Sequence, residues 1–164
     1  MRAEDMMNLK VMDVANGTTT GAIVGMLIDG DRRQVVALEV KGGLLSRAVY
    51  LPLEDIKSIE NDVLTISSPA ALLEQGDFDT FRLISNISGR QVFTEKGKLL
   101  GTVHEFDVDT KNGAITFITV ALDTSIMGGL WQSAGERFDI PRNLIATMGD
   151  SIVVTAEFHT KYSV

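Results

Sequence analysis

Residues 21–41 read GAIVGMLIDGDRRQVVALEVK, and residues 101–122 read GTVHEFDVDTKNGAITFITVAL. In each stretch, two segments rich in β-branched and other apolar residues flank a short polar turn, which is the pattern of a β-hairpin. The second turn contains Asn112 and Gly113, a pair favoured at hairpin tips because both residues tolerate a positive φ. We therefore expect residues 21–29 to pair with 34–41, and residues 101–109 to pair with 114–122.

The two hairpins belong to a longer internal repeat. Four positions recur 80 residues later: Gly17, Gly21, Asp29 and Val40 return as Gly97, Gly101, Asp109 and Val120. Pro52 returns as Pro141, 89 residues later, because the second copy carries extra residues before its proline. A repeat of about 80 residues is too long for a solenoid unit and has the size of a small domain. The chain therefore holds two copies of one compact unit.

Short groups of turn-forming residues, mostly Gly, Asn and Asp, separate strand-like segments along the whole chain. This spacing is typical of β-barrels and sandwiches. The X-Pro step after each hairpin should end a strand and open a short helical turn. In the second hairpin, Ile118 and Val120 should face the core, whereas Ile115 and Phe117 should lie on the other face. The expected fold class is all-β: two tandem small β-barrels, each with about six strands and one short helical turn.

The domain organisation follows from the repeat. We expect a first barrel over residues 1–68, a connector over 69–80, a second barrel over 81–158 and a tail over 159–164. The connector should form one or two helical turns that stop at Gly76. Units of this size bury a small share of their surface, so each copy should gain stability from its sister or from a second chain. The sequence leaves both arrangements open.

Composition limits the classes of function. The formal net charge is −7 and there is no long basic run, so direct binding to nucleic acid is not expected. The chain has no cysteine, and its apolar runs are far shorter than the roughly 20 residues that span a bilayer. The first residues lack the apolar core of a signal peptide. These features predict a cytoplasmic protein without a transmembrane segment.

The ordered set of repeated residues resembles the PRC-barrel family. In the first copy the resemblance is carried by Gly17, Gly21, Asp29 and the LPLEDI sequence of residues 51–56. In the second copy it is carried by residues 89–92, Gly97, residues 101–103 and 107–109, and Pro141. The resemblance implies two PRC-like barrels with a scaffolding or binding role. The family includes a domain of the photosynthetic reaction-centre H subunit, a domain of a ribosome-maturation factor, and stand-alone proteins.

Catalysis is not expected from these residues. His104 lies in a predicted strand, where Val24 lies in the first copy, and the adjacent Glu105 should point to the opposite face. His159 lies in the tail, so neither histidine has the orienting partner that a catalytic histidine needs. Asp29 and Asp109 fit turn positions better than a metal site. We therefore predict no catalytic residues, no metal and no cofactor.

The loops that follow the two hairpins are the predicted binding surface. Their candidate contact residues are large and apolar, which is unusual in a glycine-rich loop: Leu44, Leu45, Met127, Leu130 and Trp131. Trp131 is the only tryptophan of the chain, and tryptophan is enriched among binding hot spots. The alternative is that Leu130 and Trp131 cap the barrel or fill the seam between the copies.

Three functional hypotheses remain. The first is a non-enzymatic protein-interaction or assembly module with a protein partner of unknown identity. The twofold relation of the copies is also compatible with a homodimer. The second is a ribosome or rRNA maturation accessory that binds a ribosomal protein. The third is small-ligand sensing at the inter-barrel seam, which a preformed and largely apolar pocket there would favour.

Overall fold

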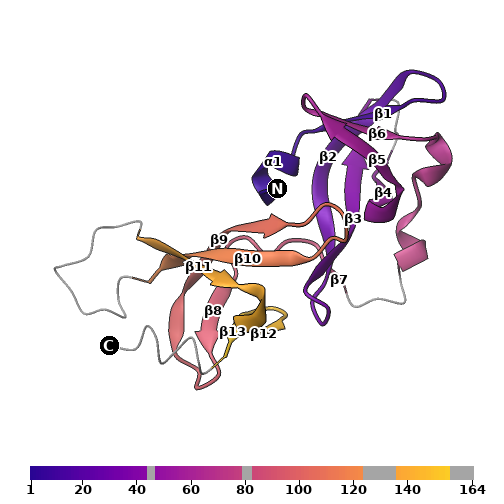
Figure 1. Ribbon diagram of the computed structural model, residues 1–164. Coiled ribbons are helices and arrows are strands. Elements are labelled where there is room, and N and C mark those ends of the chain that lie inside the picture. The colour runs from indigo at the N-terminus through magenta and orange to yellow at the C-terminus, as the bar shows by residue number, and fades with distance from the viewer. Residues whose placement is uncertain (44–46, 79–82, 124–135, 156–164) are drawn as a thin grey trace.

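The computed structural model describes residues 1–43, 47–78, 83–123 and 136–155 (Figure 1). The residues form two small β-barrels, one after the other along the chain, and the expected all-β tandem fold is confirmed. Among the described residues there is a single α-helix, α1 (Ala3–Met6), and none long and apolar enough to cross a membrane.

The first barrel is built from one curled sheet. Its strands are β1 (Lys10–Asp13), β2 (Thr18–Asp29), β3 (Gln34–Lys41), β4 (Val49–Pro52), β5 (Ile56–Glu60) and β6 (Val63–Ile66). Their order in the sheet is β4-β3-β2-β1-β6-β5, with β1 and β6 parallel and the other neighbours antiparallel. The end strands β4 and β5 are joined by the predicted helical turn, η1 (Leu53–Asp55).

The second barrel repeats this topology. Its strands are β8 (Gln91–Thr94), β9 (Leu99–Val108), β10 (Ile115–Leu122), β11 (Arg137–Pro141), β12 (Ile145–Met148) and β13 (Ile152–Val154), in the order β11-β10-β9-β8-β13-β12. The turn η4 (Arg142–Leu144) follows Pro141 as η1 follows Pro52. The predicted hairpins are confirmed as β2–β3 and β9–β10.

The repeated glycines have the same structural role in both copies. A Cβ added to Gly21 would lie 2.7 Å from the carbonyl oxygen of Lys41, and one added to Gly101 would lie 2.0 Å from that of Ala121. Both distances are shorter than a van der Waals contact, so only glycine lets the first strand of each hairpin pass this close to the second. The repeat therefore preserves backbone packing.

One prediction about the second hairpin is wrong. Ile115 was expected on the same face as Phe117, yet it is fully buried in the core, whereas Phe117 is half-buried. The register explains the difference: Ile115 pairs with Val108 and Phe117 pairs with Asp107, so Thr116 is an extra residue in a β-bulge. A bulge changes which face the following residues occupy.

The connector covers an outer face of the first barrel. It forms two short 3-10 turns, η2 (Pro69–Ala71) and η3 (Gln75–Phe78), so Gly76 lies within the second turn and does not end the helical segment as predicted. Leu73 and Tyr50 exchange two backbone hydrogen bonds of 2.8 Å, and the rings of Tyr50 and Phe78 meet edge to face at 6.0 Å. A small second core forms beneath these contacts.

The barrels are joined through their hairpin tips by a pair of equivalent hydrogen bonds. Val35 N–H donates to the carbonyl of Gly113 at 2.7 Å, and Ile115 N–H donates to the carbonyl of Arg33 at 3.0 Å. These two bonds exchange under the 80-residue repeat, because Val35 corresponds to Ile115 and Arg33 to Gly113. The copies are therefore related by a local pseudo-twofold axis at the bridge between Gln34 and its equivalent, Ala114.

Arginine side chains add to the seam on one side of this bridge. The guanidinium of Arg33 donates to the carbonyl oxygens of Ile145, at 2.7 Å, and Arg142, at 3.1 Å. In return, Arg142 donates to the carbonyl of Arg33. Burial, and then the charge of Arg33, lowers the pKa of Arg142. These bonds are directed at main-chain carbonyls, so they hold the two backbones in one relative position.

Each barrel also receives a strand or segment from the other half of the chain. The short strand β7 (Leu83–Ile84) leaves the connector and pairs with the end of β2, with Ile84 opposite Ile28. Reciprocally, Val108 at the end of β9 donates its N–H to the carbonyl of Met1 at 2.8 Å. A single cluster of buried apolar side chains runs through both barrels. The two copies thus pack on each other within the chain and share one core.

Candidate functional site

The predicted contact residues lie outside the described part of the chain. These are Leu44, Leu45, Met127, Leu130 and Trp131. The strands that lead into their loops are described: β3 and β10 run from the seam to Lys41 and to Leu122. Eight residues of strand span about 26 Å, so the two loops begin at the far ends of the two barrels (Figure 1).

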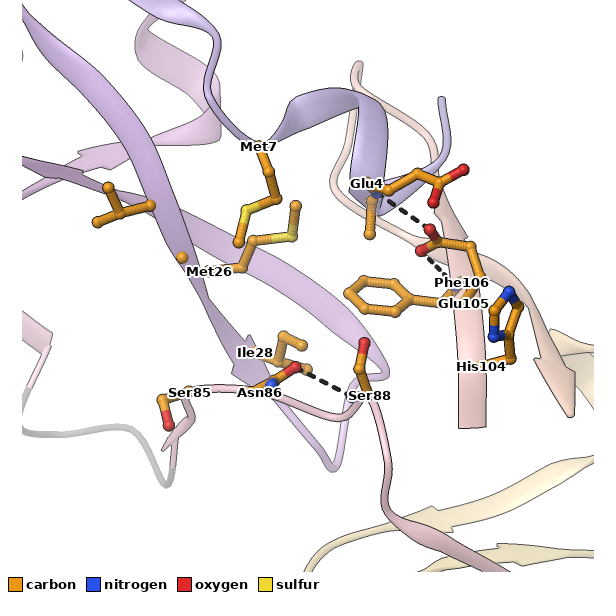
Figure 2. Close-up of a pocket in the computed structure, with 13 residues that line it drawn as sticks. Glu4, Met7, Met26, Ile28, Ser85, Asn86, Ser88, His104, Glu105 and Phe106 are labelled. Atoms are coloured by element: carbon orange, nitrogen blue, oxygen red, sulfur yellow. Dashed lines mark hydrogen bonds between the residues drawn. The ribbon is translucent and has the colours of Figure 1, made fainter. Parts of the chain in front are cut away.

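The described residues contain a cavity on the seam. Its volume is about 320 Å³. It is bounded by α1, by the middle of β2, by β9 and by residues 85–88, which precede the second barrel (Figure 2). Both barrels contribute walls, so neither copy alone could form this cavity.

The walls of the cavity are related by the same 80-residue repeat. Residues 24–26 on β2 correspond to residues 104–106 on β9, and α1 corresponds to residues 83–86. In both copies a β-bulge lies at this point. Val24 is the extra residue between the pairs formed by Ile23 and Gly25, and His104 is the extra residue between the pairs formed by Val103 and Glu105. The two bulges face each other across the seam.

The bulge in β9 corrects a prediction about its side chains. His104 and Glu105 were expected on opposite faces because they are adjacent in a strand, but both line the cavity. A bulge interrupts the alternation of side chains, so neighbouring residues can lie on the same side. The side chain of His104 is exposed at this position.

The two sides of the cavity differ in chemistry although they are equivalent in the repeat. Apart from Glu4, the side formed by α1 and β2 is mainly apolar, with Met7, Val24, Met26 and Ile28. The side formed by residues 85–88 and β9 is mainly polar, with Ser85, Asn86, Ser88, His104 and Glu105. Val24 and Met7 are 43% and 37% exposed. The arrangement suits a ligand with one apolar part and one polar part.

Glu105 is an acidic group of the cavity whose pKa is raised. Its two carboxylate oxygens accept backbone N–H bonds, one from Phe106 at 2.8 Å and one from Glu4 at 3.2 Å. Burial raises the pKa of Glu105 despite these bonds, and the nearby Glu4 carboxylate acts in the same direction. A carboxylate whose charge is disfavoured in this way is a candidate for a functional group.

The raised pKa makes a prediction about stability. Above the ordinary glutamate pKa of 4.5 the folded protein retains a proton that the unfolded chain has released. The unfolding free energy of the wild type relative to Glu105→Gln should therefore be highest below the ordinary pKa and should fall as pH rises through the raised pKa. Urea unfolding of both proteins across this pH range measures the difference in unfolding free energy, wild type minus variant. An increase of this difference with rising pH would contradict a raised pKa for Glu105.

The paired aspartates act in turns. Asp29 Oδ1 accepts the N–H groups of Asp31, at 3.1 Å, and Arg32, at 3.2 Å, and Asp109 Oδ1 accepts that of Lys111 at 2.9 Å. These are the local bonds that favour aspartate at turns. Within the described ranges, no group of three or more potential metal-ligating side chains is found.

Sequence reasoning named the seam as a place for a ligand pocket but did not identify the residues that line the cavity, although one signal was present. A histidine occupies the position of Val24 in the second copy, and a glutamate that of Gly25, so the two matched strands carry different chemistry at one point. Such a contrast marks a place where the copies have diverged. The bulges, which bring these residues to one space, could not be inferred from the pattern.

Comparison with protein-family models gives two matches to one family. The PRC-barrel domain matches residues 1–73 and again residues 79–157. A search of curated proteins finds no match. The first matched segment contains strands β1 to β6 and the second contains strands β8 to β13, so each segment covers one barrel.

Proposed function

Because this chain belongs to the PRC-barrel family through both of its halves, we propose that it is a non-enzymatic binding module and that the cavity between its barrels is a ligand site. The observation that carries the proposal is the preformed cavity on the seam. Small-molecule sites are commonly concave, mostly apolar and placed between domains, with a few polar groups that fix the ligand's orientation. The cavity lies between the two barrels and combines apolar with polar lining residues.

A ligand in this position would act on both barrels. Its walls come from α1 and β2 on one side and from β9 and residues 85–88 on the other, so binding would stabilise their docked arrangement. Binding of a ligand in the cavity and docking of the two barrels would therefore be coupled. This coupling is the physical basis for the hypothesis of ligand sensing at the seam.

The proposal can be tested by filling the cavity. Val24 is exposed and is the extra residue of a bulge, so Val24→Trp should occupy the space without disturbing the core. We expect a small molecule to co-purify from the native host with the wild type and to be absent from the variant, as measured by mass spectrometry after denaturation. Val14→Trp, at an equally exposed position that does not line the cavity, is the control. Equal recovery of the same compounds from all three proteins would refute the site.

A protein-binding role through the post-hairpin loops is a second proposal. The observation that favours it is the placement of the loop origins at the two far ends of the molecule, after Lys41 and after Leu122. An assembly module with one contact surface at each end could join two partners or two copies of itself. A stable contact buries about 1,200–2,000 Å² in total, so adjoining strands would have to contribute.

Trp131→Ala and Leu130→Ser should abolish partner binding while leaving the fold intact. Hot-spot residues of this kind commonly cost about 2 kcal/mol or more of binding energy when truncated. Affinity purification from the native host followed by mass spectrometry measures the loss, and recovery of a small-subunit ribosomal protein would favour the maturation role. Unfolding of both variants would instead show that the two residues belong to the core.

A further inference from the structure

We infer that the ligand of the seam cavity is a small organic cation, a primary amine whose ammonium group lies beside Glu105 and Glu4 and whose apolar body packs against Met26. The inference rests on the proposed ligand site and specifies the chemistry that the site selects. Three independent features support it: the sign of the charge, the separation of polar and apolar walls, and the volume.

The charge at the cavity is negative. Glu4 and Glu105 line it, whereas no lysine or arginine does so among the residues that the structure describes. The exposed Arg2 lies 3.9 Å from Glu4, a separation at which a surface ion pair contributes little. Among the residues that the structure describes, no group of opposite charge forms an ion pair with Glu105, and each of its oxygens can accept a further bond beyond the backbone N–H that it already holds. A cationic ligand would supply the missing charge.

His104 is the other titratable group facing Glu105, from the same strand, and Glu4 faces it from α1. The walls formed by β2 and by residues 85–88 carry no charged side chain at the cavity. Glu4 and Glu105 are the only acidic side chains among the described residues that line the cavity, and they make its local potential negative. An anionic ligand would be repelled, and a neutral ligand would leave both carboxylates without a counter-charge.

The apolar wall lies across the cavity from the carboxylates. Figure 2 shows Met7 and Met26 on one side, Glu4 and Glu105 on the other, and the ring of Phe106 between them. Methionine adapts to ligands of varied shape, and an aromatic ring attracts a nearby cation. A ligand with a cationic head and a compact apolar body would satisfy both walls at once.

The volume limits the size of the ligand. About 320 Å³ is at the lower end of the range for ligand pockets, which is roughly 300–1,000 Å³. A single ring with a short amine side chain has a suitable size. Ser85, Asn86 and Ser88 offer hydrogen-bonding groups to a further polar substituent at the base of the cavity.

Three probes of similar size and different charge test the inference: 2-phenylethylamine, 2-phenylethanol and phenylacetate. Binding to the intact protein is followed by NMR of ¹³C-labelled methionine methyl groups, because Met7 and Met26 line the cavity. We expect the amine to shift both signals and to bind at least about tenfold more tightly than the other two probes, since charge-assisted bonds are about twice as strong as neutral ones.

Glu105→Gln should weaken binding of the amine by about tenfold or more, with little effect on the alcohol. Glu95→Gln removes the same charge from an exposed position outside the cavity and should leave the affinity unchanged. If Glu105→Gln fails to fold, Val24→Lys provides the second variant: it adds a cation at an exposed position of the cavity and should abolish amine binding.

The failures of the two proposals are distinguishable. Equal binding of the amine and the alcohol would overturn the cationic class while supporting a ligand site. Preferential binding of phenylacetate would also overturn it. If no probe shifts the methionine signals, the inference is refuted, and the proposed site is then decided separately by the co-purification experiment with Val24→Trp.

Discussion

Replacing Gly113 by alanine is expected to disrupt the docking of the two barrels. Gly113 has a φ of +78°, and a Cβ added there would lie 2.1 Å from the carbonyl oxygen of Val35 in the other barrel. The same residue accepts the hydrogen bond from Val35 N–H, so the backbones cannot separate without losing that bond. Backbone strain and overpacking together should cost about 3 kcal/mol or more of unfolding free energy.

Gly97→Ala is the matched control for this prediction. Gly97 also has a positive φ, of +84°, but nothing lies within 4 Å of an added Cβ. Alanine there should cost only the conformational term, about 1–2 kcal/mol. Urea unfolding measures both variants. Equal losses of unfolding free energy in the two variants would show that the contact between residue 113 and the carbonyl of Val35 adds nothing to the cost of alanine.

Dividing the chain after Phe78 should leave two fragments that do not fold alone. The first fragment would lose β7, which pairs with β2, and the second would lose α1, which packs on β9. Both would expose the part of the core that they share. We expect neither fragment to unfold cooperatively, whereas a mixture of the two should regain a cooperative transition, because the seam is held by many non-covalent contacts.

Circular dichroism and amide hydrogen exchange would measure this complementation. Arg33→Ala in the first fragment removes the side-chain bonds to the carbonyls of Arg142 and Ile145 and should weaken reassembly. Arg47→Ala, which removes an exposed arginine paired with Glu74 in the same fragment, is the control. A fragment that folds cooperatively by itself would show that the barrels are independent domains.

The hairpins could be predicted because their determinants are local. Asn112 and Gly113 mark the tip of β9–β10, and the alternation of Ile118 and Val120 marks the buried side of β10, where both are fully buried. The helical turns after Pro52 and Pro141 follow from the restricted φ of proline. Each signal lies within a few residues of the structure that it produces.

The bulges could not be predicted in this way. Ile115 was assigned to the wrong face, and Glu105 to the face opposite His104, because each assignment assumed an uninterrupted alternation. Whether a strand carries an extra residue depends on its register with a neighbour, which is a property of the pair of strands. The bulges at Val24 and His104 hold residues of the cavity, so the residues of the candidate site were missed for the same reason.

The sequence by itself determined that the protein consists of two all-β copies, because a repeated set of turn residues and alternating strands needs no partner to be recognised. The tertiary structure alone decided how the copies meet, with Val35 bonded to Gly113 and Ile115 to Arg33 about a pseudo-twofold axis. It also decided that Glu105 shares one cavity with Met26 of the other barrel. Contacts between residues about 80 positions apart depend on the packing of complete surfaces, which local sequence patterns do not predict.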